Sequence, residues 1–332
     1  MADLPHVSVV IPAHNAADRL PMALDSVFAQ TYPPEKLEVI VVDDGSTDDT
    51  AAVARDHLGA SPMESQVISV ENGGPSRARN IGWRQGSGEW VQFLDDDDVL
   101  AHTKIEQQMS VAPATPADVA VLYSDWKRVQ AENPSREGDV QSPRIRDDHR
   151  LADLISTDGF IHLGSALFRR SWLERVKGFE EEHWLIEDVH LLLRMAMAGG
   201  RFGHVETEGP VFFYRQRNEG SLVADNKQAF IEGCVRNARM VERYARKNEA
   251  LTDPLRAQLI RVYFQGTRYY AGRDRERFSE IWSRIRDLNP DAHPDQPAHL
   301  RMASKILGYP VAERVAVLYR RLKSSLKGDR QS

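Results

Sequence analysis

The chain has 332 residues, a formal net charge of −6, and hydrophobic and charged fractions of 41% and 28% that are typical of a globular protein. This length accommodates one large α/β domain with an appendage, or two domains. The charge is not the basic signature of a nucleic-acid-binding protein. One cysteine, Cys234, excludes an intrachain disulfide and a cysteine-rich zinc site. The sequence shows no signal-peptide pattern and no apolar run near the ~20 residues that span a bilayer.

Apolar runs and helical spacings alternate along the first hundred residues. Short runs rich in β-branched residues predict strands at 7–11, 37–42, 66–70 and 90–94. Apolar residues at helical spacing predict helices at 16–30, 48–58 and 76–85. This order predicts an α/β fold with a mostly parallel sheet flanked by helices.

The predicted elements become shorter after residue 100. They are a helix at 104–109, a strand at 119–123, an apolar segment at 161–168, helices from 171 and at 187–197, and a strand at 211–214. The polar stretch 131–150 predicts a mobile loop. From residue 224 the pattern is helical almost to the end, so we predict two domains, 1–222 and 223–332.

Four consecutive aspartates, Asp95 to Asp98, directly follow the predicted strand at 90–94. They therefore lie at the carboxyl end of a strand, where open α/β sheets bind ligands. Four adjacent like charges repel one another, and a hard divalent cation with oxygen ligands, such as Mg²⁺, would neutralise them and also bind phosphate. The alternative is a solvated acidic turn.

A second predicted strand also ends in carboxylates, at Asp43 and Asp44. Two acidic strand ends in one parallel sheet converge on the same crevice. A carboxylate there can accept a hydrogen bond from a base imide or a ribose hydroxyl, although either aspartate could instead cap the following helix. Arg79 lies between the acidic clusters in sequence and is suited to phosphate, whereas Arg77 is better explained as a surface residue.

Four segments in this order resemble the family 2 glycosyltransferases, which have the GT-A fold and use nucleotide-sugar donors. They are VSVVIPAHN at 7–15, VVDDGSTD at 41–48, NGGPSRARN at 72–80 and FLDDDD at 93–98. The resemblance covers roughly residues 5–220.

The resemblance implies a role for each motif. The donor-binding residues would be Pro12, Ala13, His14 and Asn15 beside the nucleotide, Asp44 at the base (often uracil), Arg79 near the diphosphate, and Asp95 and Asp96 in the DXD region. Asp97 is the first choice of metal ligand, with Asp95 directed toward the ribose or the metal. The metal would be Mg²⁺ or Mn²⁺, and it would stabilise charge on the leaving nucleotide.

A downstream segment, 177–188, resembles the family's Gly-Phe-Asp-Glu sequence and its acidic catalytic pair. The resemblance implies that Asp188 is the general base and that Glu187 assists it or contacts the acceptor, in a direct displacement that inverts the anomeric carbon. The alternative is that both residues only supply charge at a helix N-terminus. Packing is the first interpretation of Trp184, and its position beside Glu187 makes an acceptor contact the alternative.

One position departs from the family pattern. Arg217 stands where many relatives have a histidine, and arginine can bind phosphate but cannot bind a metal. If that histidine binds the metal in those relatives, the metal site of this chain has one ligand fewer. His14, His162 and His183 match no zinc spacing, so we interpret them as ordinary loop or pocket residues.

The predicted function is an inverting, metal-dependent glycosyltransferase that moves a sugar from a nucleotide-diphosphate donor, preferably a UDP-sugar, to a hydroxyl acceptor. The acceptor would belong to polysaccharide, glycolipid or glycoprotein glycan assembly, and the expected location is cytoplasmic. A non-catalytic sugar-nucleotide-binding or scaffold protein is the alternative. A nucleotidyltransferase would need a glycine-rich basic loop after the first strand, which residues 12–15 do not provide.

The end of the chain is basic. Residues 305–332 contain seven Lys or Arg residues and two acidic residues, a net charge of +5, with apolar residues interleaved. Such a helix can lie on the anionic inner face of a membrane as a peripheral contact. The alternative is a helix docked on the protein with a solvated basic face.

Overall fold

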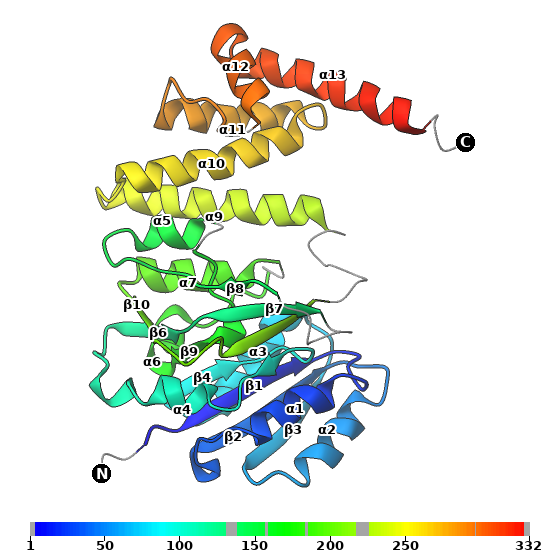
Figure 1. Ribbon diagram of the computed structural model, residues 1–332, viewed down its shortest axis with the longest axis vertical. Coiled ribbons are helices and arrows are strands. Elements are labelled where there is room, and N and C mark those ends of the chain that lie inside the picture. Colours follow the sequence, from blue (N-terminus) through cyan, green and yellow to red (C-terminus); the bar gives the residue numbers. More distant parts are fainter. Residues whose placement is uncertain are drawn as a thin grey trace. The chain divides into compact units, whose positions relative to one another are not determined.

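The structure is a computed structural model that describes residues 4–130, 138–156, 159–182, 185–216, 226–295 and 297–328, with side chains described up to residue 320 (Figure 1). The chain divides into two compact units, residues 1–225 and 226–332. The assignment of catalysis to residues 1–222 stays a prediction.

A seven-stranded sheet organises the first unit. Its order is β10 (Arg201–His204), β6 (Val119–Tyr123), β9 (Ala166–Arg169), β4 (Trp90–Phe93), β1 (Val7–Ala13), β2 (Leu37–Asp44) and β3 (Glu64–Val70). Every neighbouring pair is parallel except the two pairs made by β9, which runs antiparallel to both β4 and β6. The predicted mostly parallel sheet is confirmed.

Both faces of this sheet are covered, as the apolar runs of the sequence require. Val9 and Ile11 of β1 belong to the larger core, whereas Ile40 and Val42 of β2 pack with Ala78 on the other face. Gly82 permits this close packing, because a Cβ there would lie 2.3 Å from the side chain of Val10. The covering helices of this unit are α1 (Leu20–Phe28), α2 (Thr50–Leu58), α3 (Pro75–Gln85), α4 (Lys104–Met109), α5 (Arg150–Ile155), α6 (Arg170–Val176) and α7 (Glu187–Met197), with short 3₁₀ turns at Pro34–Lys36, Ala112–Ala114 and Leu163–Ser165.

A second, four-stranded sheet has the order β5 (Val99–Leu100), β11 (Phe212–Gln216), β7 (Trp126–Gln130) and β8 (Val140–Gln141). Only β11 corresponds to a predicted strand. Two of the others have just two residues, and in β7 the buried Trp126 and Val129 are separated by Lys127 and exposed Arg128, so none forms an apolar run. The sequence predicted a loop at 131–150, but the structure has strand β8 within this range and helix α5 beginning at its end. Residues 131–137 lie outside the described chain.

The second unit is helical, as predicted. Its helices are α9 (Lys227–Lys247), α10 (Asp253–Tyr270), α11 (Arg275–Leu288), α12 (Ala298–Leu307) and α13 (Tyr309–Gly328). The side chains of Thr252 and Asp274 accept backbone N–H groups and cap α10 and α11. Among the described helices of the whole chain, none is long and apolar enough to cross a membrane.

Candidate functional site

The carboxyl ends of β1, β2 and β4 lie next to one another, since the three strands are parallel neighbours. Pro12 and Ala13 are the last residues of β1, Asp44 ends β2, and Asp95 follows β4 after Leu94. The sheet therefore gathers the predicted donor-binding residues at one edge. This is the edge at which parallel sheets bind ligands.

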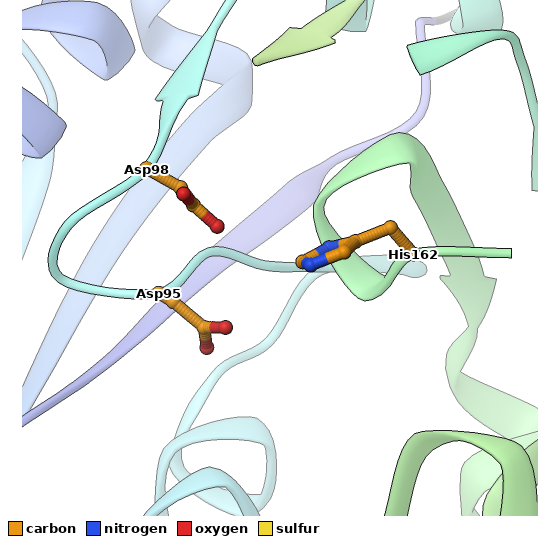
Figure 2. A group of neighbouring side chains, drawn as sticks. All are labelled: Asp95, Asp98 and His162. Carbon is orange, nitrogen blue, oxygen red and sulfur yellow. The ribbon is translucent and has the colours of Figure 1, made fainter. Parts of the chain in front are cut away.

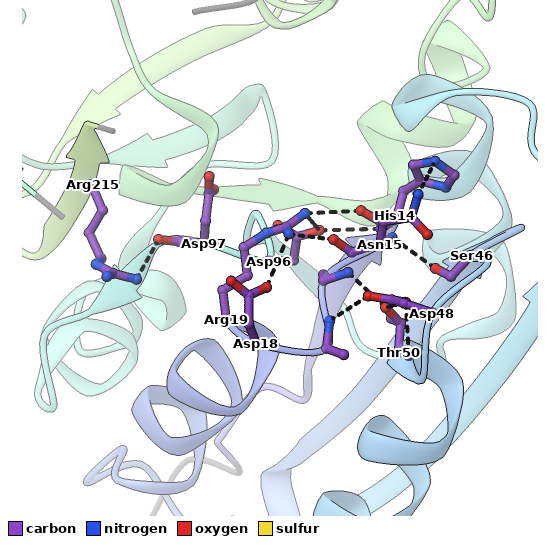
Figure 3. Close-up of polar contacts among 12 residues, drawn as sticks. His14, Asn15, Asp18, Arg19, Ser46, Asp48, Thr50, Asp96, Asp97 and Arg215 are labelled. Carbon is purple, nitrogen blue, oxygen red and sulfur yellow. Dashed lines mark hydrogen bonds and ion pairs between the residues drawn. The ribbon is translucent and has the colours of Figure 1, made fainter. Parts of the chain in front are cut away.

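The loop after β1 is tied to the loop after β2. The backbone N–H of Asn15 donates to Ser46 Oγ at 3.0 Å (Figure 3). The side-chain oxygen of Asn15 accepts from the backbone N–H of Thr47 at 2.8 Å. His14 Nδ1 lies 2.8 Å from the carbonyl oxygen of Asp44. These contacts fix the loop that is predicted to border the nucleotide.

Asp44 is buried and has a structural task of its own. Its two carboxylate oxygens accept the backbone N–H groups of Gly73 and Gly74, each at 2.8 Å. The next residue, Gly45, has φ +67°, and a Cβ there would lie 2.6 Å from the backbone nitrogen of Asn72. Only glycine suits this close turn. Recognition of the base by Asp44 stays a prediction, and it would have to coexist with these two bonds.

Asp96 binds Arg19, the residue directly before helix α1. Arg19 Nε lies 2.7 Å from Asp96 Oδ1, and Arg19 Nη2 lies 3.2 Å from Asp96 Oδ2 (Figure 3). Burial raises the pKa of Asp96 to about 6 although Arg19 opposes the shift, and the charge of Asp97 adds to it. Because Arg19 also donates to the carbonyl of His14 at 2.9 Å, Asp96 anchors the loop after β1.

Arg79 joins two parts of the site that lie far apart in sequence. It is buried in α3, and its Nη2 donates to Asp95 Oδ1 while its Nη1 donates to Glu187 Oε1, each at 2.7 Å. Burial alone would lower the pKa of this guanidinium, but the charges of Asp95 and Glu187 raise it. Burial would likewise raise the pKa of Asp95, but Arg79 and then His162 lower it. The predicted donor residues Arg79 and Asp95 therefore meet the predicted catalytic residue Glu187.

Asp188 follows Glu187 at the N-terminus of α7. Burial, and next the charge of Glu187, raise the pKa of Asp188 to about 7, and the charge of Asp95 contributes in the same direction. The backbone N–H of Val189 and the charge of Arg79 oppose this shift. A carboxylate with a pKa near neutrality is well matched to general-base work.

A third set of side chains, Asp95, Asp98 and His162, points into one space (Figure 2). One potential ligand atom from each lies within 4.8 Å of the others. Asp98 is buried, and its Oδ1 accepts the backbone N–H of Arg215 at 2.8 Å, while its Oδ2 has no hydrogen-bond partner among the described residues. Burial and the charges of Asp97 and Asp95 raise the pKa of Asp98. These carboxylates fit a divalent cation, which would occupy the unpaired oxygen and offset the repulsion.

His162 reaches this cluster because β9 is antiparallel. The beginning of β9 lies beside the carboxyl end of β4, so the turn before β9 is delivered to the same edge as Asp95. Burial lowers the pKa of His162 to about 4, which keeps the imidazole neutral. Its Nδ1 lies 3.3 Å from the backbone nitrogen of Gly164, a long contact that favours the proton on Nε2. Metal ligation through Nε2 requires that proton to move to Nδ1.

Three buried side chains hold the turn that carries His162. The carbonyls of Gly164, Ser165 and Ala166 accept hydrogen bonds from Gln92 Nε2 (3.1 Å), Gln108 Nε2 (2.8 Å) and Lys104 Nζ (3.3 Å), respectively. Lys104 also donates to Gln92. Side chains of strand β4 and helix α4 thus bind three successive carbonyls of this turn and hold it in place.

The remaining predicted residues are placed differently. The carbonyl of Asp97, the first choice of metal ligand, accepts from Arg215 Nη1 at 3.2 Å, and its side chain is not part of the Asp95–Asp98–His162 group (Figure 3). Trp184, Arg217 and His183 lie outside the described residues. Asp98 and His162 were not among the predicted site residues. For Asp98 the acidic run itself was a signal, whereas the position of His162, 64 residues beyond Asp98, gave none.

Solved structures share this fold over nearly the whole chain. S. aureus TarS in complex with UDP-GlcNAc matches with a TM-score of 0.66 and 18% sequence identity, over 95% of this chain and 92% of that one. The mannosyltransferase PcManGT from Pyrobaculum calidifontis, in complex with GDP-Man and Mn²⁺, matches with a TM-score of 0.55 and 20% identity, over 96% and 88% of the two chains. The fold is that of the GT-A glycosyltransferases.

Sequence comparison identifies the family. The model described as "Glycosyl transferase family 2" matches residues 8–177, just over half of the chain. The chain therefore belongs to glycosyl transferase family 2.

Curated relatives match only part of their own length. The minor teichoic acid biosynthesis protein GgaA of Bacillus subtilis is 26% identical over 222 residues, which are 65% of this chain and 48% of that protein. The glycosyltransferase AglE of Haloferax volcanii is 40% identical over 116 residues, 35% and 38% of the two proteins. The matched region thus spans less than half of either relative.

Proposed function

We propose that this protein is an inverting, metal-dependent glycosyltransferase that moves a sugar from a nucleotide-diphosphate donor to a hydroxyl acceptor. The observation that carries the proposal is the Arg79 bridge, which holds Asp95 of the acidic run and Glu187, next to Asp188, on one guanidinium. The bridge supports a site in which the groups for the leaving nucleotide and the base for the acceptor act on one sugar.

In the proposed reaction, a carboxylate oxygen of Asp188 takes the proton of the acceptor hydroxyl as the acceptor oxygen attacks the anomeric carbon. The new bond from that carbon to oxygen forms while its bond to the phosphate oxygen breaks, and the nucleoside diphosphate leaves with the bonding electrons. One direct displacement inverts the configuration. General-base assistance of this kind contributes about 10²–10⁴-fold in rate.

The chain's own residues divide the remaining tasks. Residues 12–15 and Asp44 would border the nucleotide, and Arg79 would hold Asp95 and Glu187 in place for catalysis. Asp95 and Asp98, with His162 as a third ligand, are the best-grouped metal-binding side chains among the described residues. A bound Mg²⁺ or Mn²⁺ would supply charge stabilisation to the diphosphate.

The comparisons support parts of the specificity. The UDP-GlcNAc complex of TarS favours a UDP-sugar, and the GDP-Man complex of PcManGT makes a GDP-sugar the second candidate. The likeness to GgaA, a teichoic acid biosynthesis protein, favours an acceptor in polysaccharide assembly. The proposal places the activity in residues 1–222, and the single cysteine fits the predicted cytoplasmic location. Peripheral membrane contact is a separate proposal, since no catalytic group depends on it.

The test is turnover of a panel of nucleotide sugars by the wild type and by Asp188→Asn, with Mg²⁺, with Mn²⁺ and with EDTA. We expect the wild type to hydrolyse one donor slowly and EDTA to stop it. Asp188→Asn should bind the same donor with unchanged affinity, measured by calorimetry, and lose at least about 10²-fold in turnover. A donor that binds tightly but is never turned over, with any metal, would favour the non-catalytic sugar-nucleotide-binding alternative.

A further inference from the structure

Helices α12 and α13 expose large apolar side chains that an isolated globular unit would bury. Ile306 is 80% exposed, Met302 is 67% exposed and Tyr319 is 62% exposed. We call this set the α12–α13 surface: Met302, Ile306, Leu307, Val311, Val315, Leu318 and Tyr319. Singly scattered apolar residues need no explanation, but seven within 18 consecutive residues do.

The spacing aligns these residues on one side of each helix. In α13, Val311, Val315, Leu318 and Tyr319 follow the i, i+4, i+7, i+8 pattern of a single helical face. In α12, Met302 and Ile306 are four residues apart. Other residues of the pair, among them Leu300, Tyr309 and Ala312, are buried and supply the packing of the unit. The exposed stripe is therefore additional to the stripe that holds the helices in place.

The charges around this surface have one sign. Arg301, Lys305 and Arg314 are exposed, and the one acidic residue of the sequence 298–320, Glu313, is buried and bound by Arg320 at 2.5 Å. The rest of the chain is acidic enough to give the protein a net charge of −6. The basic apolar segment is therefore a local feature that the overall composition does not explain.

We infer that the α12–α13 surface binds the headgroup region of an anionic lipid bilayer. An amphipathic helix binds there by burying its apolar stripe at the acyl boundary while lysine and arginine attract anionic headgroups. Tyr319 suits such an interface, where tyrosine is enriched. A second copy of the chain would instead bring Arg301, Lys305 and Arg314 toward their own counterparts, with no exposed acidic partner in residues 298–320. The inference does not depend on the proposed catalysis.

The experiment is cosedimentation of the full-length protein with vesicles of phosphatidylcholine, alone or with phosphatidylglycerol added. We expect binding that requires the anionic lipid and weakens with salt. Ile306→Ser combined with Leu318→Ser should weaken it more than about tenfold, as should Arg301→Ser combined with Arg314→Ser. Met22→Ser, a partly exposed methionine on α1, and Arg243→Ser, an exposed arginine on α9, are the matched controls and should leave binding unchanged.

The same variants distinguish the other occupants. Circular dichroism should show unchanged helicity, since the substituted side chains are exposed, and donor turnover should equal that of the wild type. Sedimentation velocity of the wild type and of Ile306→Ser/Leu318→Ser measures the oligomeric state. A dimer that this double variant dissociates, without any vesicle binding by the wild type, would assign the surface to a second copy and overturn the lipid inference. Equal binding to neutral and anionic vesicles would also overturn it.

Discussion

Two arginines bind neighbouring carboxylates of the same acidic run, and they connect them to different parts of the site. Arg79 links Asp95 to Glu187 at the start of α7. Arg19 links Asp96 to the backbone of the loop after β1. We call the part of the site that contains Arg79, Asp95 and Glu187, together with Asp98, His162 and Asp188, the Asp95 side. The part that contains Arg19, Asp96 and the loop after β1 is the Asp96 side. Adjacent positions of one motif thus serve opposite sides of the site.

The two sides also differ in how they treat a carboxylate. On the Asp95 side burial is overcome by Arg79 and His162, and the pKa of Asp95 is lowered. On the Asp96 side burial outweighs Arg19, and the pKa of Asp96 is raised to about 6. Asp95 therefore keeps its charge over a wider pH range, as a group that faces a cation should. The comparison teaches that an arginine beside a carboxylate does not by itself decide the direction of its pKa shift, because His162 adds to Arg79 at Asp95 whereas Asp97 opposes Arg19 at Asp96.

The largest effect on turnover should come from replacing each of the two arginines in turn. Arg79→Met should lower donor turnover by about 10²-fold, because Asp95 and Glu187 lose their common support and repel each other. Arg19→Met should lower it less than tenfold, acting through the loop that borders the donor. The measurement is the initial rate of donor hydrolysis under identical conditions, with thermal unfolding to confirm that both variants fold.

A conservative replacement sharpens this test. Arg79→Lys keeps the charge but lacks the planar fork that reaches two carboxylates at once, so it should stay close to Arg79→Met. If the two methionine variants lost turnover equally, or if Lys restored it, the proposed difference between the sides would be wrong.

The next effect distinguishes two neighbouring aspartates as metal ligands. Asp98→Asn should weaken Mn²⁺ binding by about tenfold or more, since Asp98 belongs to the Asp95–Asp98–His162 group. Asp97→Asn is the matched control and should change the affinity much less. The signal of free Mn²⁺ in electron paramagnetic resonance gives both affinities without any turnover. A greater loss with Asp97→Asn would restore the residue that the sequence favoured.

The pH dependence of turnover tests Asp188, the proposed base on the Asp95 side. Because protonated Asp188 cannot accept the acceptor's proton, the rate should rise with pH and level off above about 7, the raised pKa of Asp188. Below that value it should fall about tenfold per pH unit. Glu187→Gln removes one of the charges that raise this pKa, so the rising limb should move to lower pH. Glu182→Gln, at an exposed position, is the control. An unmoved limb would exclude Asp188 as the titrating base.

The last and smallest effect concerns folding stability, at Lys104, which contacts the turn that carries His162. Burial lowers the pKa of Lys104 well below its usual value, so the unfolded chain binds more protons than the folded one between these two pKa values. Folding stability should therefore rise with pH across that window, and Lys104→Met should remove the rise. Denaturant unfolding from about pH 7 to about pH 10 measures it, with exposed Lys247→Met as the control. A rise that persists in Lys104→Met would assign it to another group.

The part of the site that sequence reasoning predicted is the part built at strand ends. An apolar run that leads into Asp44 or Asp95 predicts a strand with carboxylates at its carboxyl end, and the structure has strands β2 and β4 at these places. Glu187 was predicted to act in catalysis, and the structure brings it to Asp95 through Arg79. The roles of these residues remain predictions.

The unpredicted part depends on contacts between distant segments. His162 joins the cluster only because β9 is reversed, and an apolar segment does not reveal its direction. The short strands β5 and β8 lack the length for a recognisable run. Gln92 did offer a signal, since a glutamine inside a buried strand needs partners, and it finds them in the carbonyl of Gly164 and in Lys104.

The reversed strand β9 also sets when the site can form as the chain folds. In the sheet order, β9 lies between β6 and β4, so this strand joins the β10–β6 pair to the four strands β4, β1, β2 and β3. We call β9 the seam of the sheet. Those four strands are complete in the first 93 residues, whereas the seam waits for residues 166–169. Pairings over such separations form slowly. The His162 turn can therefore join Asp95 and Asp98 only after β9 has entered the sheet, which makes assembly of the cluster a late event in the folding of this protein.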